Sequence, residues 1–254
     1  MRAWTVRVVE IATSSGLFHV RCGGGPEQPP APGQFYLARR RSAASQRNGE
    51  DAEIPAQPFL RVPLYPYNTL SGGPQFWLDA AHPYAAPSAS LREASPRDRA
   101  GLEPDDALDL LGPCGRGFDL PPRAAHLLLV AASPARLFSL LYFALDRGLA
   151  VAFLLTEDAS LPELPPEVET LRGRGSLTAE LAAWADVIAL DVPDPAAFAG
   201  QARALRLSPP LGFIQALLTP LMPCGVGACQ ACWVETHPPH ARKLACVEGP
   251  VFWW

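Results

Sequence analysis

The chain has 254 residues with a formal net charge of −4, and 48% of its residues are hydrophobic. This length allows a substantial core in one large domain or two to three small ones. No basic run or aromatic–basic alternation stands out, which argues against a nucleic-acid partner. The apolar runs are too short to span a membrane and residues 1–16 lack the apolar segment of a signal peptide, so we expect a cytoplasmic protein.

Residues 1–120 carry short alternating stretches separated by proline and glycine, such as "WTVRVVEIA", "GLFHVRCGG" and "DALDLLGPCGRGF". This texture is typical of short antiparallel strands and predicts a small β-barrel. Two polar or proline-rich insertions, at 39–53 and 82–101, are expected to form exposed loops.

Residues 121–212 alternate buried strands with helices, beginning with the strand "AAHLLLVAA". The following helix is expected to have Ser133 as its N-cap, Pro134 at its first position and Gly148 just past its end. The segments "LAVAFLLTE", "SLTAELAAWA", "DVIALDV" and "DPAAFAGQARAL" continue the pattern. Strand–helix alternation predicts a parallel sheet flanked by helices, so the overall fold class is α+β multidomain.

Residues 213–254 contain four cysteines spaced C-x4-C-x2-C-x13-C, at Cys224, Cys229, Cys232 and Cys246. In a reducing compartment such thiols are metal ligands more often than disulfides. Structural zinc usually uses two separated cysteine pairs, whereas three cysteines on one loop with a distant fourth are the plant-type [2Fe–2S] pattern. The spacing therefore favours a [2Fe–2S] cluster, with zinc as the alternative, in a domain that depends on its metal to fold.

The residues around the motif agree with a cluster. Gly225, Gly227 and Ala228 would let the backbone approach the inorganic sulfides and aim N–H groups at them. His237 and His240 are expected on a solvated loop, since four cysteines already complete the ligand set. Trp233 and the terminal "VFWW" either pack around the metal or anchor a partner. The isolated Cys22 and Cys114 are interpreted as small buried hydrophobic residues.

The segments "PGQF", "LDLLGPCGRGF", "CGVGACQACWVE" and "ACVEGPVF" occur in the same order as in one known family. The chain resembles the electron-transfer subunit of NAD-linked dihydroorotate dehydrogenase, in the ferredoxin–NADP reductase superfamily. The resemblance implies an FAD-binding barrel (1–120), an NAD-binding α/β domain (121–212) and a [2Fe–2S] domain (213–254). It also implies the four cysteines as ligands and a flavin-containing dehydrogenase subunit as partner, with this subunit not catalytic alone.

The flavin signature departs from that family. The family's barrel strand reads like L-R-R-P-I-S, in which an arginine pairs with the pyrophosphate and a serine contacts the flavin ring. Here "LRVPLYP" keeps Arg61 but has Val62 and Tyr65 at those two positions. Arg61 could serve the phosphate only after a register shift, because neighbouring side chains on a strand point to opposite faces. Ser88 or Ser90 would have to supply the hydroxyl of the following phosphate element.

The nicotinamide signature departs further. The family's strand-to-helix turn is glycine-rich, because bare backbone lets a pyrophosphate approach the helix N-terminus. Here the turn reads "VAASPARLF", so Ala131, Ala132 and Ser133 add side chains there, and NAD binding is not expected. Two functions remain: an electron-transfer subunit that serves a flavoprotein, or a structural or redox-sensing iron–sulfur subunit that has lost both nucleotides.

Overall fold

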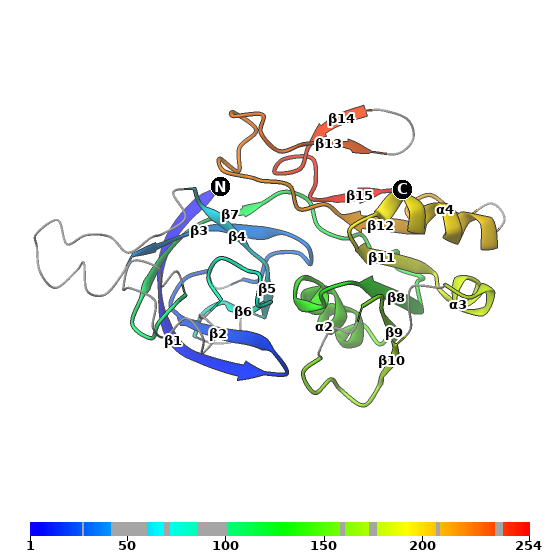
Figure 1. Cartoon of the computed structure of the whole chain (residues 1–254), viewed down its shortest axis with the longest axis horizontal. Helices are drawn as coiled ribbons and strands as arrows, with labels where there is room; N and C mark the ends of the chain where they lie inside the picture. Colours follow the sequence, from blue (N-terminus) through cyan, green and yellow to red (C-terminus); the bar gives the residue numbers. More distant parts are fainter. Residues whose placement is uncertain are drawn as a thin grey trace, which may run out of the picture.

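The computed structural model describes residues 1–26, 28–41, 60–68, 72–85, 101–157, 161–172, 177–206, 209–236 and 241–254. Its strands form a seven-stranded sheet, a six-stranded sheet and a two-stranded hairpin. The first two sheets lie side by side, and the C-terminal segment lies across the top of both (Figure 1). The predicted α+β order of barrel, α/β layer and cysteine segment is confirmed.

The seven-stranded sheet curls into a near-closed antiparallel barrel with strand order β4-β3-β7-β1-β2-β6-β5. Alternating side chains fill its interior, among them Val6 and Val8 of β1 and Cys22 of β2. Cys22 is a small buried residue, as predicted, and desolvation raises its pKa to about 12. The strands are β1 (Arg2–Ser14), β2 (Leu17–Gly23), β3 (Phe35–Arg41), β4 (Val62–Leu64), β5 (Pro66–Asn68), β6 (Gln75–Leu78) and β7 (Ala107–Cys114).

The six-stranded sheet has the order β10-β9-β8-β11-β12-β15, and its first five strands are parallel. Strand β8 reads as a continuous apolar run because both faces are covered. Leu127 and Leu129 pack in the core that contains α2, while Leu128 and Val130 pack in the core that contains α3 and α4. The strands are β8 (His126–Ala131), β9 (Ala150–Leu155), β10 (Val168–Arg172), β11 (Val187–Asp191), β12 (Ile214–Leu217) and β15 (Val251–Trp253).

The helix after β8 differs from its prediction at one end. It begins as a 3-10 turn, η3 (Ala135–Leu137), and continues as α2 (Phe138–Asp146). No side chain caps the turn, and the hydroxyl of Ser133 instead donates to Asp79 Oδ2 of the barrel at 3.1 Å. The expected N-cap role of Ser133 was therefore wrong, because a carboxylate from the neighbouring barrel takes its hydrogen bond. Gly148 follows the helix with φ 75°, as expected.

The two later helices begin at side-chain caps. Thr178 accepts from the Leu181 N–H at the start of α3 (Ala179–Trp184), and Asp194 accepts from the Ala197 N–H at the start of α4 (Pro195–Leu205). Each cap satisfies a backbone donor that the first turn leaves free. No described helix combines the length and apolarity needed to cross a membrane.

Both ends of residues 213–254 belong to the six-stranded sheet. Strand β12 lies parallel beside β11, and β15 lies antiparallel beside β12 as the edge strand. Between them, β13 (Trp233–Thr236) and β14 (Ala241–Leu244) form the separate hairpin. The division of the chain at residues 120 and 212 remains a prediction. Most of the two predicted loops, at 39–53 and 82–101, lies outside the described residues.

Candidate iron–sulfur site and the implied nucleotide sites

The cysteine loop contains three residues in the left-handed region, Gly225 (φ 67°), Gly227 (φ 75°) and Gln230 (φ 54°). A side chain at Gly225 would place its Cβ 2.6 Å from Leu37 Cδ1 of the barrel, so glycine is required there. A Cβ at Gly227 would lie 3.1 Å from Val247 Cγ2. The glycines thus let the loop rest closely on the barrel and on the segment that follows Cys246.

The four motif thiols lie in two pairs. Cys232 Sγ is 3.2 Å from Cys246 Sγ, and both residues are buried. Cys224, of intermediate exposure, lies near Cys229, which is exposed. Among the described residues, no three His, Cys, Asp or Glu side chains converge on one point. The loop therefore offers one buried and one more exposed thiol pair.

Backbone N–H groups point at the more exposed pair. Desolvation raises the pKa of Cys224, but hydrogen bonds from the backbone of Cys229, Val226 and Ala228 and from the Cys229 side chain lower it to about 6. Burial, with the neighbouring Cys232, instead raises the pKa of Cys246 to about 12. Because the thiolate is the metal-binding form, a cation would be needed to deprotonate Cys246.

The cysteine segment is fixed by contact between two glycine-containing motifs. The backbone N–H of Arg116 in "GPCGRGF" donates to the Gly249 carbonyl in "VEGPVF". A Cβ at Gly115 would overlap that same carbonyl. On the far side of the turn, the N–H of Leu218 donates to the Pro250 carbonyl at 2.8 Å. The barrel end thereby positions Cys246 next to Cys232.

Cys114 is buried, as predicted, and lies at the end of β7 beside the cysteine loop. A Cβ at Gly225 would be 3.2 Å from Cys114 Sγ. Burial raises the pKa of Cys114 to about 11, and Cys224 contributes to the rise. Sequence reasoning placed this thiol far from the motif, because it stands 110 positions before Cys224 and only folding brings the two together.

The sequence left two roles open for the aromatic residues near the loop, which are packing in the core and contact with a partner. Phe252 is buried and Trp254 packs partly buried against both cores of the α/β sheet. Trp233 is 52% exposed, and the guanidinium of Arg242 lies 4.6 Å above its ring. The expectation for His237 and His240 concerns residues outside the described part of the chain.

Arg61 of the flavin motif borders a cavity and is also held by the barrel backbone. Its guanidinium donates to the Asp109 carbonyl at 2.8 Å and to the Leu37 carbonyl at 3.4 Å. Both acceptors are backbone groups of the barrel strands β7 and β3. Arg61 therefore holds strands together, and Ser88 and Ser90 lie outside the described residues.

Tyr65 is 7% exposed, and its ring packs against Phe35 with centroids 5.7 Å apart. Its hydroxyl is buried and has no hydrogen-bond partner within the part of the chain that the structure describes, and burial raises its pKa above the usual range. A cavity of about 390 Å³ lies beside it, bordered by Val62, Trp77 and Arg136 and by residues 219–222.

The strand-to-helix turn after β8 is occupied by protein groups. Arg136 forms a bidentate ion pair with Asp191 at the end of β11, with both N–O distances 2.8 Å. Asp191 is buried, and the N–H of Ala132 donates to its carbonyl. The polar side chains of Ser133 and Arg136 at this turn are thus both bound to carboxylates.

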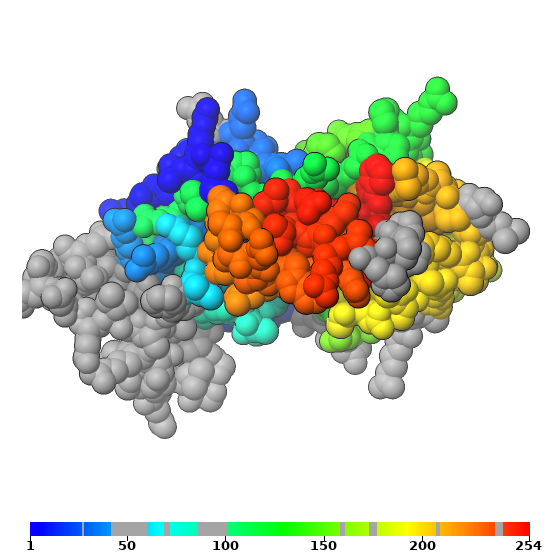
Figure 2. Space-filling model, turned by 90° about the horizontal axis from the view of Figure 1, so that it is seen from above, coloured from blue at the N-terminus to red at the C-terminus, as the bar shows by residue number. Residues whose placement is uncertain are grey.

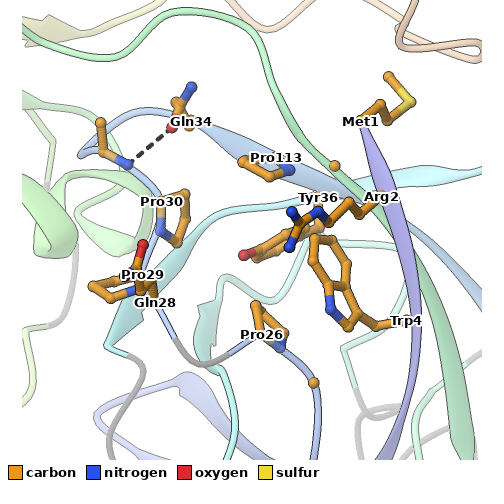
Figure 3. A pocket seen from close by; sticks show the side chains of 13 residues that line it. Met1, Arg2, Trp4, Pro26, Gln28, Pro29, Pro30, Gln34, Tyr36 and Pro113 are labelled. Atoms are coloured by element: carbon orange, nitrogen blue, oxygen red, sulfur yellow. Dashed lines mark hydrogen bonds between the residues drawn. The ribbon is translucent and has the colours of Figure 1, made fainter.

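A cavity of about 830 Å³ lies elsewhere, at one end of the barrel. Figure 3 shows Arg2, Trp4 and Tyr36 directed into it from β1 and β3, opposite Pro26 and Pro30. None of its lining residues belongs to the flavin, nicotinamide or cysteine motifs. This cavity is therefore separate from the sites that the sequence indicated.

Residues 219–254 match the family model described as the iron–sulfur cluster binding domain of dihydroorotate dehydrogenase B. No curated protein matches the chain.

Solved structures share the fold. An NADH-dependent reduced ferredoxin–NADP oxidoreductase is 19% identical with a TM-score of 0.66, over 98% of this chain and 87% of the other. The FAD apo form of the ferredoxin reductase of carbazole 1,9a-dioxygenase is 14% identical with a TM-score of 0.55, over 85% and 66%. The FAD/NAD-binding domain of nitric oxide dioxygenase from Vibrio cholerae is 12% identical with a TM-score of 0.51, over 84% and 96%.

The cysteine motif and the order of the sheets thus agree with both comparisons. The chain therefore has a ferredoxin-reductase-like fold, and its C-terminal residues 219–254 are similar to the iron–sulfur cluster binding domain of dihydroorotate dehydrogenase B.

Proposed function

We propose that this chain transfers single electrons through a [2Fe–2S] cluster bound by Cys224, Cys229, Cys232 and Cys246. The partner in this proposal is a flavin-containing dehydrogenase subunit of the dihydroorotate dehydrogenase type. A cluster of this kind exchanges one electron at a time, so its function is relay and not chemistry on a substrate.

The arrangement of the thiols in two pairs is the observation that carries the proposal. A single tetrahedral zinc ion needs four ligands around one point. A two-iron cluster instead takes two protein ligands on each iron. The pair Cys232–Cys246 and the pair Cys224–Cys229 fit that requirement.

The position of the loop supports exchange with a second protein. Figure 2 shows the C-terminal segment, in orange and red, on the surface over the junction of the barrel and the α/β sheet. Cys229 is exposed, and its neighbour Val226 is 54% exposed. One end of the proposed cluster would therefore lie close to solvent, while the Cys232–Cys246 end would lie inside.

The test is anaerobic purification followed by iron and sulfide analysis and electron paramagnetic resonance of the dithionite-reduced protein. We expect about two irons and two sulfides per chain and the signal of a reduced two-iron cluster. Cys232→Ser should abolish the signal and most of the iron. Cys114→Ser is the matched control, since it changes a buried thiol beside the loop and should keep the cluster. A zinc-loaded, colourless protein would refute the proposal.

The alternative is a structural or redox-sensing cluster without an electron-accepting partner. Two observations favour this alternative: Tyr65 is buried, and Arg136 is paired with Asp191. Rapid mixing of the reduced protein with a dihydroorotate dehydrogenase catalytic subunit distinguishes the two. Reoxidation of the cluster by the oxidised flavoprotein supports relay, and no reoxidation supports the structural role.

A further inference from the structure

The space between the barrel and the α/β sheet is crossed by side chains of this chain. Trp77 of the barrel packs on Phe138 of α2 with ring centroids 5.7 Å apart. Tyr67 packs on Tyr142 of the same helix at 5.6 Å. In a ferredoxin-reductase-like fold, this junction is where the resemblance places a flavin ring and a nicotinamide.

The two aromatic contacts are reinforced by a polar one. The Ser133 hydroxyl donates to Asp79 Oδ2 and so ties the nucleotide turn to the barrel. A dinucleotide phosphate at this turn would meet the carboxylate of Asp79 as well as the side chain of Ser133. A negative ligand beside an ionised carboxylate is disfavoured by like-charge repulsion.

On the flavin side of the junction, Arg61 is the arginine that the described part of the flavin motif offers, and it borders the cavity. Its Nη1 is engaged by two backbone carbonyls of the barrel. Val62, at the position of the phosphate-binding arginine, is buried and uncharged. A pyrophosphate here would lose a charge-assisted hydrogen bond, an interaction about twice as strong as a neutral one.

The ring position is filled as well. Tyr65 belongs to the buried core together with Phe35 and Leu37 and is not free to swing aside. The remaining cavity of about 390 Å³ is near the lower end of the range for single small ligands, roughly 300–1,000 Å³. A dinucleotide with two ring systems needs more room than this. The residues present therefore do not fit FAD.

We infer that this chain relays electrons without a flavin or nicotinamide of its own and receives them singly from a separate one-electron carrier protein. The inference rests on the proposed function, because it takes the cluster as the redox centre. In each cycle the carrier is oxidised by one electron and one iron of the cluster is reduced from ferric to ferrous. The same electron then leaves for the partner flavoprotein, and no hydride is transferred on this chain.

The experiment uses the full-length holoprotein under anaerobic conditions, with three measurements on one preparation. Flavin released by acid is expected below about a tenth of an equivalent per chain. Reduced methyl viologen, a one-electron donor, should bleach the cluster absorbance partly, to the level of the dithionite-reduced protein. NADH at millimolar concentration should leave it unchanged over the same time.

Each outcome decides a different claim. Bleaching by NADH, or near-stoichiometric FAD, would overturn the inference and leave the proposed cluster function intact. Failure of reduced methyl viologen to bleach an iron-containing protein would instead refute the proposed function.

A second measurement distinguishes two reasons for an absence of flavin, which are a site that cannot bind FAD and a site that lost FAD during purification. The protein is incubated with excess FAD, passed through a desalting column and analysed again. We expect no flavin to remain with the wild-type chain, and retention of about one equivalent would overturn the inference. The FAD-containing ferredoxin reductase of carbazole 1,9a-dioxygenase, stripped of flavin, provides the positive control.

Discussion

The ring of Tyr65 packs against the ring of Phe35 at 5.7 Å and carries a buried hydroxyl that has no partner among the described residues. A buried hydroxyl without a hydrogen bond costs about 1–3 kcal/mol. The ring of Tyr65 therefore stabilises the core while its hydroxyl destabilises it. Substitutions at this position can measure the two contributions separately.

Tyr65→Phe should keep the stability or raise it by about 1 kcal/mol, because it removes the unpaired hydroxyl and retains the ring. Tyr65→Ser should lower it by about 3 kcal/mol, since it leaves a cavity in the core. Urea denaturation followed by circular dichroism measures both. A Tyr65→Phe variant that loses as much stability as Tyr65→Ser would show that the hydroxyl has a partner in solution.

Arg136→Met should cost about 3–5 kcal/mol, because it leaves the carboxylate of Asp191 buried without its cation. The double variant Arg136→Met/Asp191→Leu should recover most of that loss, since an apolar pair can replace a buried ion pair. Denaturation of both single variants and the double variant gives the coupling energy. Additive losses would mean that the two side chains act independently.

Gly115→Ala should destabilise the protein by several kcal/mol and make its iron labile, since the new Cβ would meet the Gly249 carbonyl that positions the cysteine segment. Gly148→Ala is the matched control. Gly148 has the same φ of 75° but no atom near its would-be Cβ, so only about 1 kcal/mol of backbone strain is expected. The measurements are thermal melting and release of iron to a chelator. Equal effects of the two variants would exclude a specific role for the Gly115 contact.

His82 gives the protein a predicted pH dependence. Burial lowers the pKa of His82 below its usual value, and the positive charge of Arg136 lowers it further. The hydrogen bond to the Pro63 carbonyl and the charge of Asp79 act in the opposite direction but are outweighed. In the unfolded chain the His82 side chain takes up a proton near pH 6.5, whereas in the folded chain it stays neutral at that pH. Stability should therefore be complete above that pH and fall as the pH drops, by at most about 1.4 kcal/mol per unit.

His82→Gln removes this titration while it keeps a polar side chain that can reach Pro63 and the Tyr84 N–H. Melting temperatures from pH 8 to pH 5 should decline less for the variant than for the wild type. Parallel curves for the two proteins would assign the pH dependence to other groups.

The fold followed from sequence because local patterns and burial agree in most elements. The apolar run "HLLLVA" is a strand covered on both faces, and the Thr178 and Asp194 caps stand where the helices begin. Strand β10 (Val168–Arg172) was not predicted, because this edge strand exposes most of its residues and has no apolar alternation. The sequence assigned residues 213–254 to a segment of their own, and only the tertiary structure shows that β12 and β15 of this segment extend the α/β sheet through the pairing of β12 with β11.

The sequence by itself indicated an iron–sulfur centre, because iron–sulfur clusters are held by cysteine thiolates and the spacing of four cysteines is written in the chain. Tertiary structure alone decided how the thiols pair, that Cys114 lies beside them, and that Arg61, Ser133 and Arg136 are engaged by protein groups. Those relationships depend on side chains from distant strands meeting at the junction of two sheets. A spacing pattern shows which residues are present. The burial and hydrogen bonds that occupy these side chains arise only when the sheets pack together.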